Sequence, residues 1–122
     1  MSQVDPRIAR ACRHLDEDES LLASVVAGEI GGRRGRVVLV TNQRVLVAWT
    51  RPAPPDVLRL ETCVARWAPG SGTLTLSDGA RMISLADVEA TAAREIVELL
   101  GTIADRPLAK RLAQALQPPK DT

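Results

Sequence analysis

Short apolar or alternating runs, separated by turn residues, fill the chain from about residue 21 to residue 85. Two valine-rich runs, Val37–Val40 and Val45–Trp49, are joined by the polar link Thr41–Arg44. Short runs rich in β-branched residues and bounded by turn residues are typical of strands. The pattern predicts seven strands: Leu21–Ile30, Arg36–Thr41, Arg44–Thr50, Val57–Leu60, Thr62–Trp67, Thr73–Ser77 and Arg81–Leu85.

Two of the predicted turns are specified by their residues. Asn42 is a residue type that tolerates the left-handed conformation, and Thr41 can hydrogen-bond its own backbone, so this turn is expected to be very tight. Arg44 then begins the next strand, where we expect it to pair with a carboxylate or with carbonyl groups. Asp78-Gly79 is a strong signal for a two-residue hairpin.

The helical period appears at both ends of the chain. Ile8, Cys12 and Leu15 recur at helical spacing and predict a short helix over Pro6–Leu15. After residue 86 the apolar period becomes helical again, which predicts a helix from about Asp87 to Leu100. Asp87 is its expected N-cap and Gly101 its expected C′ residue. A last helix is predicted from Pro107 to about Leu116.

These elements predict a mainly β fold with helices, α+β by count. Seven short antiparallel strands in a flat sheet would leave two open edges, whereas bending the sheet removes most of this problem. We therefore expect a seven-stranded antiparallel, partly open barrel or orthogonal sandwich, capped by the helix near the C-terminus. The expected division is an N-terminal helix and acidic linker over 1–19, a domain over 20–101, and a C-terminal amphipathic helix and tail over 102–122.

Composition narrows the class of protein. The 122 residues are 45% apolar and 25% charged, which fits one packed domain. The net charge is only +1, so the chain as a whole has no strong positive potential that would attract nucleic acid. Trp49 and Trp67 are the only aromatic residues, which disfavours a base-stacking surface. The acidic run Asp16–Glu19 is expected to be a solvated loop or helix end. Without a long apolar segment or signal sequence, we expect a cytoplasmic protein.

The residues offer no evident catalytic or metal set. His14 is the only histidine, and no paired cysteines accompany it to complete a zinc site. Cys12 and Cys63 are expected to be reduced, and Cys63 to lie in the core. Gly31–Gly35 lacks the Gly-Lys-Ser/Thr ending of a phosphate-binding loop. The sequence therefore predicts a protein that is not an enzyme and that needs no cofactor.

An ordered set of features runs through about residues 20–101. It consists of Gly28, Val40-Thr41-Asn42-Gln43-Arg44, Val57–Leu60 after a proline-bearing loop, the Gly70–Gly72 turn, Asp78-Gly79 and Ala86-Asp87. In this order the features resemble the bacterial pleckstrin-homology (PH)-like domain family. Val47 departs from the family pattern, since an aromatic residue is frequent there, and the closing helix lacks the tryptophan of eukaryotic PH domains. The resemblance implies a barrel that serves as a binding or scaffold module.

Two functions from different classes follow as expectations. The leading one is protein–protein interaction or self-assembly, with a homo-oligomer or another protein as the partner. Its expected interface is the stripe Leu108, Leu112 and Leu116. We expect this stripe to dock on the chain's own barrel or on a second copy. The alternative is a basic amphipathic helix that lies on a membrane surface.

The alternative function is binding of an anionic lipid or phosphate ligand by arginines of the first inter-strand loop, which implies peripheral contact with the inner face of the membrane. The candidate residues are Arg33, Arg34 and Arg36, with Arg44 added. The simpler interpretation of the same charges is a solvated loop that binds no ligand.

Overall fold

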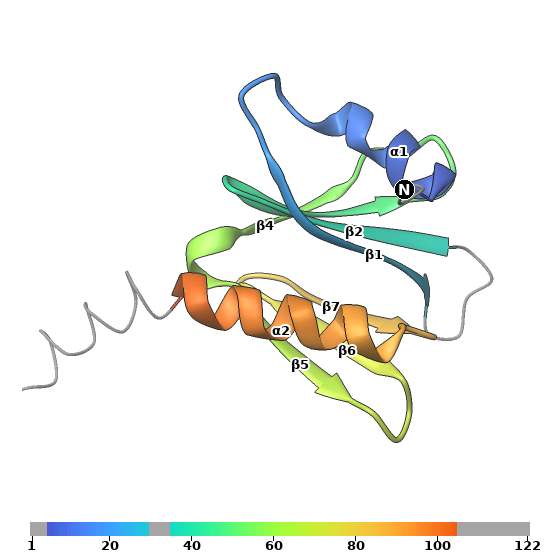
Figure 1. The fold of residues 1–122 in the computed structure, drawn as a ribbon, viewed down its shortest axis with the longest axis vertical. Coiled ribbons are helices and arrows are strands. Elements are labelled where there is room, and N and C mark those ends of the chain that lie inside the picture. Colours follow the sequence, from blue (N-terminus) through green and yellow to red (C-terminus); the bar gives the residue numbers. More distant parts are fainter. Residues whose placement is uncertain (1–4, 30–34, 105–122) are drawn as a thin grey trace, which may run out of the picture.

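Seven antiparallel strands form one sheet in the order β4-β3-β2-β1-β7-β6-β5, as the computed structural model shows for residues 5–29 and 35–104 (Figure 1). The α+β fold is the one that the sequence predicts, with one short helix before the sheet and one long helix after it. The strands are β1 (Leu21–Glu29), β2 (Gly35–Thr41), β3 (Arg44–Trp49), β4 (Asp56–Arg59), β5 (Val64–Ala68), β6 (Thr73–Ser77) and β7 (Met82–Ala86). The helices are α1 (Pro6–Ala11), α2 (Ala90–Ala104) and the 3₁₀ turns η1 (Cys12–His14) and η2 (Leu60–Thr62).

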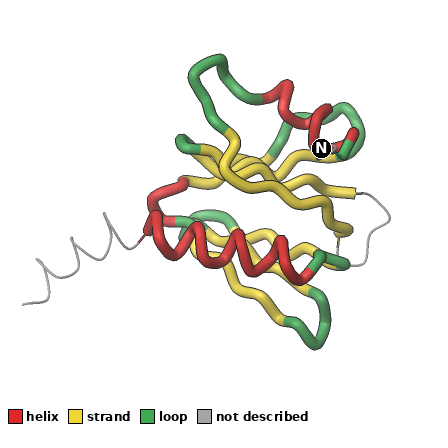
Figure 2. The backbone as a smooth tube through the Cα atoms, in the orientation of Figure 1, coloured by secondary structure: helices red, strands yellow, loops and turns green. Residues whose placement is uncertain are grey.

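The sheet bends at β1, which joins its two halves. β1 pairs with β2 along most of its length, but it pairs with β7 only at Gly28 and Glu29. We call this short junction the β1–β7 seam. In Figure 2 the half β1–β4 lies above α2, and the strands of the half β5–β7 lie behind and below this helix. Inward side chains of both halves, such as Val38 and Leu76, meet Ile96 of α2 in one buried cluster, which is the main core.

A second apolar cluster lies on the opposite face of β2 and β3. Val37, Leu39 and Leu46 are fully buried there beneath Ala11 of α1. Both faces of these two strands are therefore covered, which explains why their sequences are continuous apolar runs rather than alternating ones. The N-terminal helix is thus packed on the outer face of the first half-sheet.

The long helix differs from its prediction at both ends. It begins at Ala90 and continues past Gly101 to Ala104, so neither Asp87 nor Gly101 has the expected capping position. Asp87 instead has a left-handed φ of 56°, which reverses the chain after β7. The cap is provided by Glu89, whose carboxylate accepts hydrogen bonds from the N–H groups of Thr91 and Ala92 at 2.6 and 3.3 Å.

Two turns also differ in detail from their predictions. Asn42 does not adopt the left-handed conformation, because Asp87 alone among the described non-glycine residues has a positive φ. The turn is held by Thr41, whose Oγ1 accepts hydrogen bonds from the N–H groups of Gln43 and Arg44. Asn42 Oδ1 accepts a hydrogen bond from the N–H of Ser20 at 2.8 Å, which ties the turn to the start of β1.

The hairpin between β6 and β7 has a four-residue loop rather than a two-residue one. Ser77 pairs with Met82, which leaves 78–81 in the loop. The Asp78 carboxylate accepts hydrogen bonds from the N–H groups of Ala80 and Arg81, and Gly79 has a φ of +92°. A side-chain acceptor and one left-handed glycine stabilise this longer loop.

Candidate functional site

Arg36 lies within β2 and is 4% exposed, not in the preceding loop. Its guanidinium donates hydrogen bonds to the backbone carbonyls of Val47 and Ala48, and it forms an ion pair with Asp56 at 2.6 Å. The guanidinium carbon also lies 3.6 Å from the ring centre of Trp49. These contacts take up most of its five donors, so Arg36 is already engaged inside the protein. Arg33 and Arg34, predicted to act with it, lie outside the described residues.

Arg44 pairs with a carboxylate, as the sequence predicts. Its Nε and Nη2 each donate to an oxygen of Glu19 at 2.9 Å, and Nη2 also donates to the His14 carbonyl. Thr41 donates to the same carboxylate at 2.6 Å. The prediction that the whole acidic run is solvated is wrong for Glu19, whose side chain is fully buried.

The surroundings of Glu19 strongly favour its charged form. Hydrogen bonds from Arg44, and then from Thr41, lower the pKa of Glu19 from 4.5 to about 2, although burial acts in the opposite direction. The same contact raises the pKa of Arg44. Both groups are therefore charged at neutral pH and hold the N-terminal segment against the β2–β3 turn. This is a structural role, and it leaves Arg44 largely occupied.

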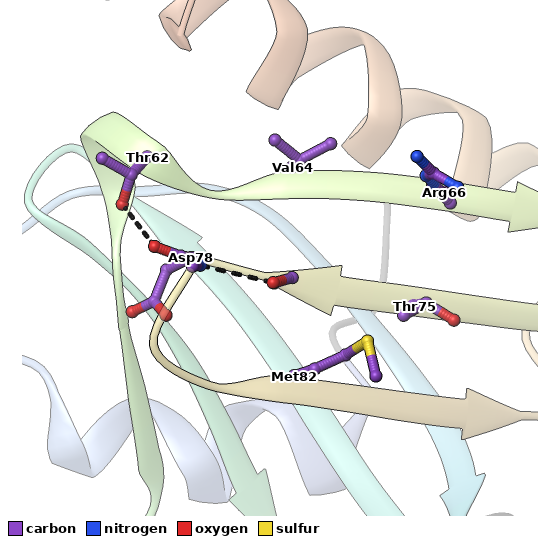
Figure 3. A pocket seen from close by; sticks show the side chains of 8 residues that line it. Thr62, Val64, Arg66, Thr75, Asp78 and Met82 are labelled. Carbon is purple, nitrogen blue, oxygen red and sulfur yellow. Dashed lines mark hydrogen bonds between the residues drawn. The ribbon is translucent and has the colours of Figure 1, made fainter.

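A groove lies on the outer face of β5, β6 and β7 (Figure 3). It has a volume of about 650 Å³. Met82 is 70% exposed and Val64 is 52% exposed, the two most exposed large apolar side chains among the described residues. Thr62, Val64, Arg66, Thr75, Ser77, Asp78, Gly79 and Met82 line the groove, which we call the outer groove.

Strand alternation explains how the outer groove arises. In β6, Leu74 and Leu76 are buried in the main core, so Thr75 and Ser77 point outward. Ser77 pairs with Val64 on one side and with Met82 on the other, which places these three residues in one row across the face. The next row contains Arg66, Thr75 and Ser84, and the last two hydroxyl groups are 3.2 Å apart.

The end of the groove is formed by the loops around Asp78. The Thr62 hydroxyl donates to the Asp78 carbonyl at 3.0 Å, and the Gly79 N–H donates to the Ser77 hydroxyl. Backbone N–H groups of Arg59, Ala80 and Arg81 lower the pKa of the Asp78 carboxyl. The Asp78 carboxylate is therefore charged and accepts its hydrogen bonds from backbone N–H groups. These hydrogen bonds hold this end of the groove in place.

The groove offers apolar area, hydroxyl groups and one cation, Arg66. Cys63, which precedes Val64 in the chain, is buried in the main core. Burial, with a smaller effect from the charge of Asp78, raises the pKa of the Cys63 thiol to about 11. Within residues 5–29 and 35–104, no three His, Cys, Asp or Glu side chains are grouped so as to hold a metal ion. This surface is suited to contact with another macromolecular surface by van der Waals packing and hydrogen bonds.

The outer groove is not among the sites that the sequence predicts. Its signal is present in the strands as Val64 and Met82, exposed apolar residues at strand positions that alternate with partly buried apolar ones. The expected interface residues Leu108, Leu112 and Leu116 lie beyond the described part of the chain. No protein-family model, curated protein or solved structure matches this chain. Among the described helices, none is both long and apolar enough to cross a membrane.

Proposed function

We propose that this chain is a PH-like binding module without enzymatic activity, and that it associates with protein through the outer groove. The strand order, the bend at β1 and the closing helix α2 support the PH-like assignment. The resemblance of the sequence over about residues 20–101 supports it independently.

The contrast between two outer sheet faces carries the proposal. The outer face of β2 and β3 is covered by α1, so that Val37 and Leu39 are fully buried. On the outer face of β5–β7 the corresponding apolar residues, Val64 and Met82, remain exposed. Exposed apolar side chains within a groove with polar residues at its rim are typical of interaction surfaces.

The proposed partner is a second copy of this chain. Two copies can pack outer face to outer face, which buries Val64 and Met82 of both. β5 is an edge strand that pairs only with β6 in the described sheet, so no further strand of the described chain extends this face. Three strands of five residues cover only a few hundred Å², below the ~800 Å² per partner of a stable interface. We therefore expect a transient dimer that dissociates on dilution.

Light scattering after size-exclusion chromatography tests this proposal over low to high micromolar concentration. The average mass of the unaltered chain should rise with concentration. The double variant Val64→Glu/Met82→Glu should stay monomeric, because burying two carboxylates would oppose docking. The matched control is Val57→Glu, an equally simple change at a 45% exposed valine on the other edge strand, β4, which should associate as the unaltered chain does.

Two results would contradict the proposal in different ways. A monomer at every concentration removes the second copy as the partner. Association that is equal in the unaltered chain and in the double variant removes the outer groove as the interface, even if dimers form.

The anionic-ligand function gains less support. Its pattern requires Arg36 to turn toward a ligand, whereas the guanidinium is held by Asp56, two carbonyl groups and the Trp49 ring. Vesicles containing acidic lipid that bind the chain at low salt, and fail to bind an Arg33→Ala/Arg34→Ala variant, would nevertheless favour this second function.

A further inference from the structure

Met82 is the most exposed sulfur-containing residue among those that the structure describes. Its side chain is 70% exposed, whereas Cys12 is half-buried and Cys63 is fully buried. Figure 3 shows the Met82 side chain rising from β7, with its sulfur pointing toward β6 over the outer groove. The other methionine, Met1, lies outside the described residues. Met82 is therefore the described sulfur that a dissolved oxidant reaches most easily.

The two thiols compete poorly with Met82 for an oxidant. A thiol reacts with peroxides as its thiolate. Burial raises the pKa of the Cys12 thiol, and burial also accounts for most of the rise in the pKa of Cys63 to about 11. Both thiols are therefore protonated at neutral pH. A thioether has no proton to lose, so its reaction with a peroxide follows its exposure alone.

Met82 also lies where a change in polarity affects docking. Ser77 pairs with Val64 on one side and with Met82 on the other, so Met82 is one of the two apolar residues in the row across the outer groove. A thioether is flexible and polarizable and packs well against apolar surface. A sulfoxide carries a strongly polar oxygen in its place, and burying that oxygen without a hydrogen-bond donor is unfavourable.

We propose that Met82 is a redox-sensitive modification site, and that its oxidation by a hydroperoxide separates two copies of the chain. The inference rests on the proposed function, since it concerns the same groove and the same partner. The sulfur lone pair attacks one peroxide oxygen and the O–O bond breaks. The hydroxide that leaves takes the proton of the transferred hydroxyl group and becomes water. Sulfur loses two electrons, and the peroxide gains them.

Docking and oxidation oppose each other in this arrangement. Docking of the two outer faces covers the Met82 sulfur, so only the free monomer reacts with the peroxide. Conversely, a chain that carries the sulfoxide docks less tightly, and the population shifts toward monomers. Dilution therefore speeds the modification, and the modification in turn favours dissociation.

The rate of sulfoxide formation tests whether docking protects Met82. The variant Val57→Met supplies an internal reference, because Val57 is 45% exposed on β4 and lies outside the groove. The variant is treated with excess hydrogen peroxide at low and at high micromolar concentration, and peptide mass mapping follows both methionines. The rate at Met82 relative to the reference should fall in proportion to the monomer fraction measured by light scattering. A ratio that is independent of concentration would overturn the proposal.

Association of the oxidised chain gives the second measurement. The chain with a sulfoxide at Met82 should associate at least about tenfold more weakly than the unoxidised chain. Methionine sulfoxide reductases that act on both epimers should restore the association. Thermal unfolding should be unchanged, because the side chain is largely exposed. In Met82→Leu, peroxide treatment should leave the association constant as it was before treatment. A loss of association there, or an unfolded sulfoxide chain, would contradict the proposal.

The measurements separate this inference from the proposed function. If the unoxidised chain is a monomer at every concentration, the proposed function fails and the inference fails with it. If the unoxidised chain associates, Val64→Glu/Met82→Glu does not, and the sulfoxide chain associates as the unoxidised chain does, the outer groove remains the interface and only the redox inference is overturned.

Discussion

Glu19 connects the N-terminal segment to the β2–β3 turn through three partners. Its carboxylate receives hydrogen bonds from Arg44, from the Thr41 hydroxyl and from the N–H of Asp16. Arg44 also reaches the His14 carbonyl, just before the linker to β1. A buried carboxylate with this many donors stabilises the fold only while it is charged.

Replacing Glu19 by Gln should lower the free energy of unfolding by about 1–3 kcal/mol at neutral pH. Since the folded-state pKa of Glu19 is lowered from 4.5 to about 2, its contribution is complete above pH 4.5 and is lost as the pH falls to about 2. The difference between the unaltered chain and Glu19→Gln should therefore shrink through this window. Urea unfolding at a series of pH values measures it.

The matched control is Glu17→Gln, two residues earlier in the same acidic run. Glu17 is exposed and forms no ion pair with any other residue that the structure describes. Its substitution should change stability little at any pH. A pH-independent loss in Glu19→Gln would mean that packing, rather than charge, accounts for the effect.

Arg36 illustrates which residue-level features the sequence could not reveal. Its position beside a glycine and other arginines indicates an anion-binding loop. Its actual partner Asp56 is twenty residues away and is brought close by the pairing of β3 with both β2 and β4. Arg44 was easier to predict, because a charged residue at the start of a buried strand requires a nearby partner.

At the scale of elements, Gly101 lies inside α2, and a Cβ added there would have no heavy atom within 4 Å. Gly101→Ala should therefore stabilise the protein by about 0.5–1 kcal/mol, because alanine loses less backbone freedom in a helix. Thermal unfolding measures this. A C′ glycine in the left-handed conformation would give the opposite sign.

Gly79 provides the matched comparison for that prediction. Space is also free around its Cβ position, but its φ is +92° in the β6–β7 loop. Gly79→Ala should destabilise the protein by about 1 kcal/mol. A stabilising Gly79→Ala would mean that the backbone of this loop changes easily, and would weaken the conformational argument for both glycines.

The extents of the elements were predictable from sequence wherever the apolar period was clear. β6 has the predicted bounds, because Thr73–Ser77 alternates strictly and is bounded by turn residues. The ends of α2 were not predictable from local preference, because Asp87 is used in a left-handed reversal and Glu89 caps the helix with a longer side chain. Capping competes with turn formation at neighbouring residues, and tertiary contacts decide between them.

At the scale of the whole molecule, the two apolar clusters share β2 and β3. Leu39 is buried on the α1 side, and Leu76 is buried in the main core. Leu39→Ala and Leu76→Ala should each lower stability by about 2–5 kcal/mol, with a single unfolding transition in both variants. Denaturant unfolding followed by circular dichroism and by tryptophan fluorescence measures this. If Leu39→Ala instead gave two separate transitions, the N-terminal helix would unfold on its own.

The covering of the outer faces could not be predicted from the strands alone. The continuous run Val37–Val40 indicates a strand buried on both faces, but it does not say that α1 provides the cover. Conversely, Val64 and Met82 become recognisable as an exposed pair only when the register of β5, β6 and β7 is known. The row that brings Val64, Ser77 and Met82 together depends on the register of two hairpins, which local pattern does not specify.

The β1–β7 seam has a consequence for the order of folding. Its two residue pairs join positions 58 and 56 residues apart in the chain, whereas the β2–β3 and β6–β7 hairpins are local. Long-range contacts of this kind close large loops, and we expect them to form after the rate-limiting step. Gly28→Ala, whose Cβ would lie 3.3 Å from Asp87 Oδ2, should then speed unfolding while refolding keeps its rate. Stopped-flow measurements of both rates would reveal whether the molecule closes its sheet last.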